Sequence, residues 1–364
     1  MKQLDVNFGK NRTYSITIGT GLLEQVDRYV KDLFNGRKIA VISDLRVMDL
    51  YGNKVGERLK EAGFQVSKFA FEPGEKSKTL KTYGEILNFL AEEGFDREDL
   101  IVAVGGGVTG DLAGFAAATY MRGIDYVQVP TTLLAQVDSS VGGKTGIDLD
   151  KGKNLAGAFW QPKSVICDLE VLETLDEREY ASGMGEVVKY GVLSGRYVLD
   201  ILEKAARCQG LDFQVLEELV YRCIKIKKNL VEADEQDFAI RHMLNLGHTV
   251  GHGLEAISGY ELSHGQAVSV GIAVMARYMA SRGVMYEGDL NHLLEIMEKV
   301  GAMADYECDL QELRQAICSD KKISGDEIQL VMPEKLGHCV LETIKLDKLE
   351  DILREGFRYH ESNN

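Results

Sequence analysis

The chain has 364 residues, 45% of them hydrophobic, and its 42 Lys and Arg stand against 57 Asp and Glu, which gives a formal net charge of −15. This length fits a globular protein of about two domains, and the composition excludes a disordered chain, a collagen and a disulfide-rich scaffold. A nucleic-acid or anionic membrane surface would carry a basic stripe, so the acidic balance disfavours both as partners. Any anionic ligand must therefore be met by local clusters of Lys and Arg.

The sequence also predicts the cellular compartment of the protein. No stretch approaches the roughly 20 uninterrupted apolar residues of a membrane span, and the beginning of the sequence contains no apolar signal core. The six cysteines are scattered without a C-x-x-C pair, so they predict neither a disulfide framework nor a thiolate zinc site. We expect a cytoplasmic protein with reduced cysteines and no membrane partner.

The first twenty residues predict an antiparallel hairpin. Residues 4–8 and 14–18 alternate apolar and polar side chains around the turn sequence Gly9-Lys10-Asn11. We expect this hairpin to form an edge of a sheet.

From there to about residue 178, β-rich runs alternate with helical stretches. The runs 38–43, 100–104 and 126–129 are apolar nearly throughout, which is typical of strands covered on both faces by helices. Helical spacing is found in residues 46–62 and 79–93. The pattern predicts an α/β domain with a largely parallel sheet over residues 1–178.

A glycine-rich turn, Gly105-Gly106-Gly107-Val108-Thr109-Gly110-Asp111, follows the strand 100–104 and leads into an Ala-rich helix at 111–119. It matches G-x-G-x-x-G, in which backbone amides and a helix N-terminus approach a pyrophosphate because Gly has no Cβ. The turn predicts a Rossmann-like nucleotide-binding sheet; a tight turn without a ligand is the alternative. The best ribose-binding acid, Asp44, lies upstream of the glycines instead of about 20 residues downstream, which implies a different strand order.

A second glycine-rich run covers residues 137–146 and precedes 151–154. Its Gly-Lys-Thr tripeptide resembles a triphosphate-binding loop, but that motif requires Gly at position 138, which is Asp138. We predict a flexible loop bearing Lys144, Lys153 and Asn154, which are donors suited to a phosphate or a carboxylate. The alternative is that these are ordinary solvated surface residues.

Beyond about residue 179 helical periodicity dominates, with only a short β-like piece at 327–332. This predicts a mainly helical second domain over residues 179–364. The expected helices cover 180–193, 197–206, 214–233, 242–257, 265–282, 287–300 and 309–318.

The helical half contains a candidate metal site. His248 and His252 stand at i and i+4 on one helix face, His264 follows, and Glu186 could complete a set of two histidines and a carboxylate. Such a set with an open position is the usual form of a catalytic zinc site, and Co²⁺ would suit the same ligands. The alternative is a solvated helix face, and spacing alone does not decide which of the three histidines are ligands.

Together these residues resemble the 3-dehydroquinate synthase family, the NAD- and zinc-dependent cyclases of the shikimate pathway. The shared motifs run in family order and with family spacing over roughly residues 40–340. They are Pro73-Gly74-Glu75-x-x-Lys78, the turn 105–111, Tyr120-Met121-Arg122-Gly123, Pro130-Thr131-Thr132, residues 138–148, Gly152-Lys153-Asn154, Gly183-x-x-Glu186-x-x-Lys189, Arg241-x-x-x-Asn245 through His252, His264-Gly265 and Asp320-Lys321-Lys322.

The resemblance implies a role for each matching residue. Glu186, His248 and His264 become the zinc ligands, and His252 becomes the substrate-contacting, proton-transfer histidine, with Lys144, Lys189, Arg241 and Asn245 as further catalytic residues. The implied substrate contacts are Arg122, Lys153, Asn154, Lys227 and one of Lys321 and Lys322, between which the sequence does not decide. The implied NAD contacts are Asp44, Glu75, Lys78, Gly106, Gly107, Val108, Asp111, Thr131, Thr132, Asp138, Lys144, Lys153 and Thr174. At position 237 the family usually has Glu and this chain has Asp237, which puts a role there in doubt.

The resemblance also implies a reaction and an assembly. The reaction turns 3-deoxy-D-arabino-heptulosonate 7-phosphate into 3-dehydroquinate and phosphate by transient oxidation with NAD⁺, β-elimination, reduction, ring opening and an intramolecular aldol step. A homodimer is the family expectation, with Arg122 a candidate for reaching across the interface. The competing interpretations are another sugar-phosphate cyclase such as 2-deoxy-scyllo-inosose synthase, a metal-dependent polyol dehydrogenase, and a catalytically silent NAD-binding protein.

Overall fold

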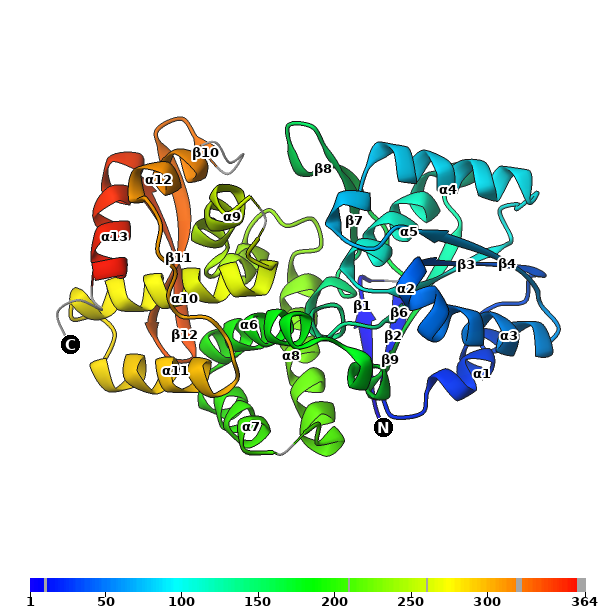
Figure 1. The fold of residues 1–364 in the computed structure, drawn as a ribbon, viewed down its shortest axis with the longest axis horizontal. Helices are drawn as coiled ribbons and strands as arrows, with labels where there is room; N and C mark the ends of the chain where they lie inside the picture. The colour runs from blue at the N-terminus through cyan, green and yellow to red at the C-terminus, as the bar shows by residue number, and fades with distance from the viewer. Residues whose placement is uncertain (10–11, 209, 260, 319–322, 359–364) are drawn as a thin grey trace. The chain divides into compact units, whose positions relative to one another are not determined.

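The structure of the protein is a computed structural model that describes residues 1–9, 12–208, 210–259, 261–318 and 323–358 (Figure 1). The chain forms two compact units. The first comprises residues 1–175 and 227–236, and the second comprises residues 176–226 and those from 237 onward. Within the described ranges, no helix combines the length and the apolar composition that crossing a membrane requires.

The first unit contains a seven-stranded sheet, formed by β1 (Lys2–Asn7), β2 (Thr13–Gly19), β3 (Lys38–Asp44), β4 (Gln65–Phe71), β5 (Leu100–Gly105), β6 (Asp125–Pro130) and β9 (Ser164–Asp168). Their order in the sheet is β1-β2-β9-β6-β5-β3-β4. β1 and β2 pair antiparallel with β1 at the edge, which confirms the predicted hairpin, although its turn residues 10 and 11 lie outside the described residues. The other pairs are parallel, as predicted.

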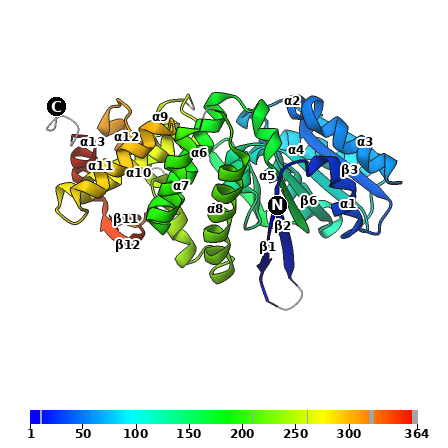
Figure 2. The same ribbon diagram turned by 90° about the horizontal axis from the view of Figure 1, so that it is seen from below.

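Helices cover both faces of this sheet (Figures 1 and 2). α4 (Leu80–Glu92) and α5 (Gly107–Thr119) lie on one face, and α1 (Val26–Lys31) and α3 (Asn53–Glu61) lie on the other. Every residue of β5 is buried, as expected for a central strand between two helical layers. α5 begins at Gly107, four residues before the predicted start at 111, because Gly106 has an extended backbone and serves as the N-cap, so the later glycines are already helical.

The order of the strands explains why Asp44 precedes the glycine-rich turn. β4 pairs with one side of β3 and β5 pairs with the other, so the chain changes direction across the sheet between them. Ile42 stands opposite Ala103, which brings the ends of β3 and β5, Asp44 and Gly105, to the same edge of the sheet. Ligands of open α/β sheets bind at such a switch point, outside the carboxyl ends of the strands.

The prediction of a flexible loop around Lys144, Lys153 and Asn154 is wrong. These residues belong to an antiparallel hairpin of β7 (Lys144–Leu149) and β8 (Gly152–Phe159). Its glycines reflect close strand approach: Gly146 stands opposite Gly157, and a Cβ on Gly157 would lie 2.1 Å from the Thr145 carbonyl oxygen. Glycine therefore marks a packed strand pair at this place.

The second unit is mainly helical, as predicted. Its helices are α6 (Glu177–Ser194), α7 (Arg196–Arg207), α8 (Phe213–Ala233, whose last residues belong to the first unit), α9 (His248–Ile257), α10 (His264–Ser281), α11 (Glu287–Lys299), α12 (Leu310–Cys318) and α13 (Leu346–Arg358). The β-like piece at 327–332 lies in the three-stranded sheet of β10 (Ile323–Ser324), β11 (Glu327–Lys335) and β12 (His338–Lys345). Neither β12 nor α13 was expected from the sequence.

Short 3-10, α- or π-helical turns connect these elements: η1 (Leu23–Gln25), α2 (Leu45–Val47), η2 (Met48–Gly52), η3 (Glu75–Ser77), η4 (Tyr120–Arg122), η5 (Ala135–Ser139), η6 (Leu169–Thr174) and η7 (Ile240–Asn245). The last of them corrects one prediction. Residues 242–257 do not form one helix, because η7 ends at Asn245 and α9 starts at His248. Between them Gly247 has a φ of +77°, a left-handed conformation that glycine adopts readily and that interrupts the helix.

Candidate active site

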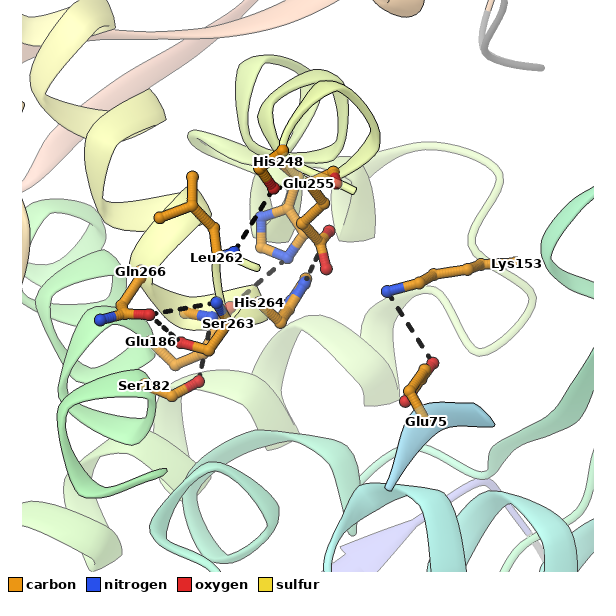
Figure 3. A network of polar contacts seen from close by, with 12 residues as sticks. Glu75, Lys153, Ser182, Glu186, His248, Glu255, Leu262, Ser263, His264 and Gln266 are labelled. Carbon is orange, nitrogen blue, oxygen red and sulfur yellow. Dashed lines mark hydrogen bonds and ion pairs between the residues drawn. The ribbon is translucent and has the colours of Figure 1, made fainter. Parts of the chain in front are cut away.

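Three of the predicted metal ligands converge in the second unit (Figure 3). Glu186 lies in α6, and His248 and His264 are the first residues of α9 and α10. The Oε1 atom of Glu186 is 3.6 Å from Nε2 of His248 and 3.3 Å from Nε2 of His264. One ligand atom from each residue lies within 4.8 Å of the others, so a single cation could contact all three.

The close packing of α6 and α10 brings Glu186 and His264 together. A Cβ on Gly265 would lie 1.7 Å from the carbonyl oxygen of Ser182, and a Cβ on Gly185 would lie 2.1 Å from that of Gly265. Only glycine at both positions allows the two backbones to approach this closely. The Gly265 amide also donates a hydrogen bond of 3.1 Å to the Ser182 hydroxyl, which fixes the start of α10 against α6.

The two histidines are oriented through their other ring nitrogens. Nδ1 of His248 lies 3.1 Å from the carbonyl oxygen of Leu246, and Nδ1 of His264 lies 3.3 Å from Oε2 of Glu255. In the neutral form of each ring the Nδ1–H can donate there, which leaves the Nε2 lone pair for a cation beside Glu186. Two imidazole nitrogens and one carboxylate suit Zn²⁺ or Co²⁺ and leave room for a further ligand, so these residues fit the metal that the sequence predicts.

The carboxylates at this site are already paired with positive charges. Lys189 forms an ion pair with Glu186, and both side chains are 1% exposed. Burial lowers the pKa of His264, but its hydrogen bonds to Glu186 and Glu255 outweigh burial and raise the pKa to about 10. In the metal-free protein His264 is therefore protonated at neutral pH. A cation that binds there must displace this proton.

His252 stands beside this group without joining it. Its ring centre is 5.5 Å from that of His248 and 5.8 Å from that of His264. With Glu255 and His264 it forms a second set whose ligand atoms lie within 4.8 Å of one another. The half-buried ring of His252 is thus close enough to the predicted ligands to act on a molecule held by them.

The other predicted residues of the second unit differ in exposure. Arg241, in η7, is 2% exposed, and Asn245 at the end of η7 is half-buried. Asp237 has a left-handed backbone with a φ of +61°. Lys321 and Lys322, with the preceding Asp320, lie outside the described residues.

Six of the predicted nucleotide contacts gather at one edge of the sheet. Asp44 ends β3, Gly106, Gly107 and Val108 form the start of α5, and Thr131 and Thr132 follow β6. The adjacent pairing of β3, β5 and β6 places these three groups side by side. The Thr131 hydroxyl is buried and has no hydrogen-bond partner among the described residues, so it is available to a ligand. With the amides at the N-terminus of α5, these groups fit a nucleotide phosphate.

Lys78 connects predicted nucleotide and substrate contacts. Its Nζ lies 2.5 Å from Oδ2 of Asp111 and 2.5 Å from Oδ1 of Asn154, and the residue is 4% exposed. Burial lowers the pKa of Lys78, but the charges of Asp111 and Glu75 outweigh burial and raise it, so the ammonium stays protonated. Asp148 completes the network, because it accepts a 2.7 Å hydrogen bond from the amide of Asn154, whose φ is +54°.

Replacing Lys78 with methionine is expected to destabilise the first unit by about 3 kcal/mol, because the Asp111 carboxylate loses its buried counter-charge. Urea unfolding measures the loss. The double variant Lys78→Met/Asp111→Asn is expected to recover part of it, since the uncompensated charge is then gone. Equal stability of the two variants would show that the charge of Asp111 is not the cause.

The remaining predicted residues of the first unit make separate contacts. Lys227 donates to the carbonyl oxygen of Asp138 at 2.7 Å and pairs with its carboxylate at 3.1 Å. Lys153 lies 4.0 Å from Glu75 (Figure 3), and the Thr174 hydroxyl lies 2.6 Å from that of Tyr51. Two further residues are exposed: Lys144, at the start of β7, and Arg122, which has a φ of +68°.

Three contact residues were not among the sequence predictions: Asp148, Tyr51 and Glu255. Asp148 lies within the motif at 138–148, but only the structure shows its bond to Asn154. Glu255 follows His252 by three residues and His248 by seven, so it lies on the same face of α9, and this helical spacing could have identified it. We find no sequence signal that would have identified Tyr51.

The chain is similar to proteins of known family over nearly its whole length. Two family models match, one described as 3-dehydroquinate synthase N-terminal over residues 68–182 and one described as 3-dehydroquinate synthase C-terminal over residues 183–323. The 3-dehydroquinate synthase of Clostridium kluyveri is 41% identical over 357 residues, which is 97% of this chain and 98% of the relative.

Several solved structures have the same fold as this chain. A 2-deoxy-scyllo-inosose synthase complexed with carbaglucose-6-phosphate, NAD⁺ and Co²⁺ superposes with a TM-score of 0.88 at 28% identity, covering 98% of this chain and 100% of that one. The 2-epi-5-epi-valiolone synthase of Streptomyces hygroscopicus, solved with NAD⁺ and Zn²⁺ bound, has a TM-score of 0.85 at 23% identity, covering 98% of this chain and 99% of that one. The second similarity concerns the fold alone.

Proposed function

Because this chain belongs to the 3-dehydroquinate synthase family, we propose that it converts 3-deoxy-D-arabino-heptulosonate 7-phosphate into 3-dehydroquinate and phosphate. The observation that carries the proposal is the convergence of Glu186, His248 and His264 in a chain that matches this family over nearly its whole length. The enzyme is a phosphate-eliminating lyase that uses NAD⁺ and a divalent cation, Zn²⁺ or Co²⁺.

The cofactors supply the chemistry that side chains lack: bound NAD⁺ takes up a hydride and returns it within one turnover, and a bound divalent cation polarises substrate oxygens. Glu186, His248 and His264 would hold the cation through one carboxylate and two Nε2 atoms. Asp44, the start of α5 and the hydroxyl of Thr131 would hold the nucleotide. Because the substrate is only transiently oxidised, no net oxidation is expected.

The chain's own residues bind and orient an anionic substrate. It carries a phosphate and a carboxylate, whereas the chain has a net charge of −15, so local cations must provide the attraction. Arg241 and Lys189 are buried, where a charge acts more strongly than at the surface. Together with Asn245 they are suited to position carboxylate and hydroxyl groups. A ring nitrogen of His252, beside the predicted ligands, is placed to hold or move a proton.

The proposal extends to the remaining residues and to the organisation of the chain. Residues 1–178 would serve as the NAD-binding domain and 179–364 as the metal- and substrate-binding domain. Arg122, Lys144, Lys153, Asn154 and Lys227 would add substrate contacts from the N-terminal part and α8. We further propose that the protein is a cytoplasmic homodimer. Light scattering on the purified protein would measure its oligomeric state.

The deciding assay follows phosphate release from 3-deoxy-D-arabino-heptulosonate 7-phosphate with Zn²⁺ and substoichiometric NAD⁺, together with NADH absorbance. We expect many phosphates for each NAD⁺ and no lasting NADH. Stoichiometric NADH with a polyol substrate would instead indicate a dehydrogenase. Absence of phosphate release from the folded, metal-loaded protein would reject the synthase and favour another sugar-phosphate cyclase.

A further inference from the structure

Glu255 is a buried carboxylate for which the proposed chemistry provides no role. It lies in α9, and its side chain is 4% exposed. A carboxylate is costly to bury unless it is paired, so its neighbours show what it does. One of them is His264: Oε2 of Glu255 lies 3.3 Å from Nδ1 of this ring.

The imidazole of His264 therefore connects two carboxylates. Its Nδ1 faces Glu255, and its Nε2 faces Oε1 of Glu186 at 3.3 Å (Figure 3). The two nitrogens of one ring point to different sides, so a ring held at Nδ1 by an anion can offer only Nε2 to a cation. His248 is held differently, because its Nδ1 faces the neutral carbonyl oxygen of Leu246 at 3.1 Å.

We infer that Glu255 is a positioning residue for the metal site: its carboxylate accepts the Nδ1–H of His264, fixes the ring's tautomer and directs Nε2 toward the cation. This inference rests on the proposed function, since it takes Glu186, His248 and His264 as the ligands. An anionic partner also makes the opposite nitrogen a stronger donor. The neutral carbonyl that faces His248 gives no such gain, so the two histidine ligands are unequal.

The competing explanation is that Glu255 is itself a metal ligand. Glu255, His252 and His264 also have ligand atoms within 4.8 Å of one another, so Glu255 could itself bind a cation. The positioning role and the ligand role predict different losses of metal affinity when Glu255 is replaced. Removing the charge of a positioning residue weakens binding by about 10- to 100-fold, whereas removing a ligand costs as much as losing His248.

The test is a Co²⁺ titration of the metal-free protein, followed by visible absorption and by competition with a chelator, and it requires no turnover. Glu255→Gln is expected to keep one Co²⁺ per chain and a ligand-field spectrum of wild-type intensity, with affinity about 10- to 100-fold weaker. Glu255→Asp, which retains the charge, is expected to fall between Glu255→Gln and the wild type. Glu298→Gln, an exposed acid of α11, is the matched control and is expected to bind as the wild type does.

The outcomes separate the inference from the proposed function. Wild-type affinity in Glu255→Gln overturns the inference, and so does a loss as complete as that of His248→Ala, which would make Glu255 a ligand. If the wild-type protein binds no Co²⁺, or His248→Ala binds it equally well, the proposed metal site fails first. If circular dichroism of the metal-free protein shows that Glu255→Gln does not fold, Glu255→Asp takes its place in the comparison. Wild-type Co²⁺ affinity in Glu255→Asp, with the spectrum and stoichiometry also retained, supports a role for the charge of Glu255. A complete loss of Co²⁺ binding in Glu255→Asp opposes that role.

Discussion

Replacing His248 with alanine is expected to lower the rate of phosphate release by about a thousand-fold or more, because each 1.4 kcal/mol of lost transition-state stabilisation costs tenfold and a cation contributes several kcal/mol. Glu186 and His264 would remain, but two ligands hold a cation poorly. The fold is expected to survive, because His248 is the first residue of α9 and alanine is favourable in a helix, although the His248 side chain is only 12% exposed. Metal content by atomic emission and the rate of phosphate release measure the two effects.

The matched control for His248 is His338→Ala. His338 lies on β12, its side chain is 55% exposed, and it takes no part in the proposed site. It is expected to retain wild-type metal content and rate. If His248→Ala instead kept its metal and reacted within about tenfold of the wild type, His248 would not be a ligand, and the set of His252, Glu255 and His264 would become the candidate.

Replacing Gly265 with alanine is expected to cost at least about 3 kcal/mol of stability and to abolish tight cation binding. The new Cβ would lie 1.7 Å from the Ser182 carbonyl oxygen and 2.6 Å from its carbonyl carbon, and neither backbone atom can turn aside as a side chain would. α6 and α10 must therefore separate. This movement would carry Glu186 and His264 apart, so stability and metal affinity are expected to fall together. Thermal unfolding and a Co²⁺ titration measure both.

Gly84→Ala is the control for the added methyl group. Gly84 lies within α4, and a Cβ there would meet no atom within 4 Å. Alanine favours the helix over glycine by about 1 kcal/mol, so this variant is expected to be as stable as the wild type or slightly more stable. Wild-type stability and metal affinity in Gly265→Ala would show that α6 and α10 can part without moving the ligands, contrary to this account.

Much of the fold could be predicted because its signals are local. The apolar runs at 38–43 and 100–104 identified buried parallel strands, and the hairpin at the beginning of the chain followed from alternation around a turn. The ligand candidates were also local signals, since His248 and His252 are one helical turn apart. Their roles came from the family resemblance, because motif order and spacing record which residues act together without showing where they lie.

The predictions that were wrong depended on contacts between distant parts of the chain. The glycines of β7 and β8 were interpreted as a loop, although Gly146 and Gly157 are paired across two strands. The helix expected at 242–257 is broken at Gly247, where a Cβ would lie 2.5 Å from the carbonyl oxygen of Val268 in α10. A glycine thus has the same sequence signal whether it forms a flexible turn or permits close packing.

The sequence by itself determined the alternation of strands and helices, the helical second half and the residue types suited to a cation and an anionic substrate. Only the tertiary structure decided that Asp44 meets the glycine-rich turn, that His264 lies between Glu186 and Glu255, and that Lys78 bridges Asp111 and Asn154. The physical reason is the range of the forces involved. Helix and strand preferences act over a few residues, whereas strand order and the approach of two helices depend on side chains that are far apart in the chain and meet only when it has folded.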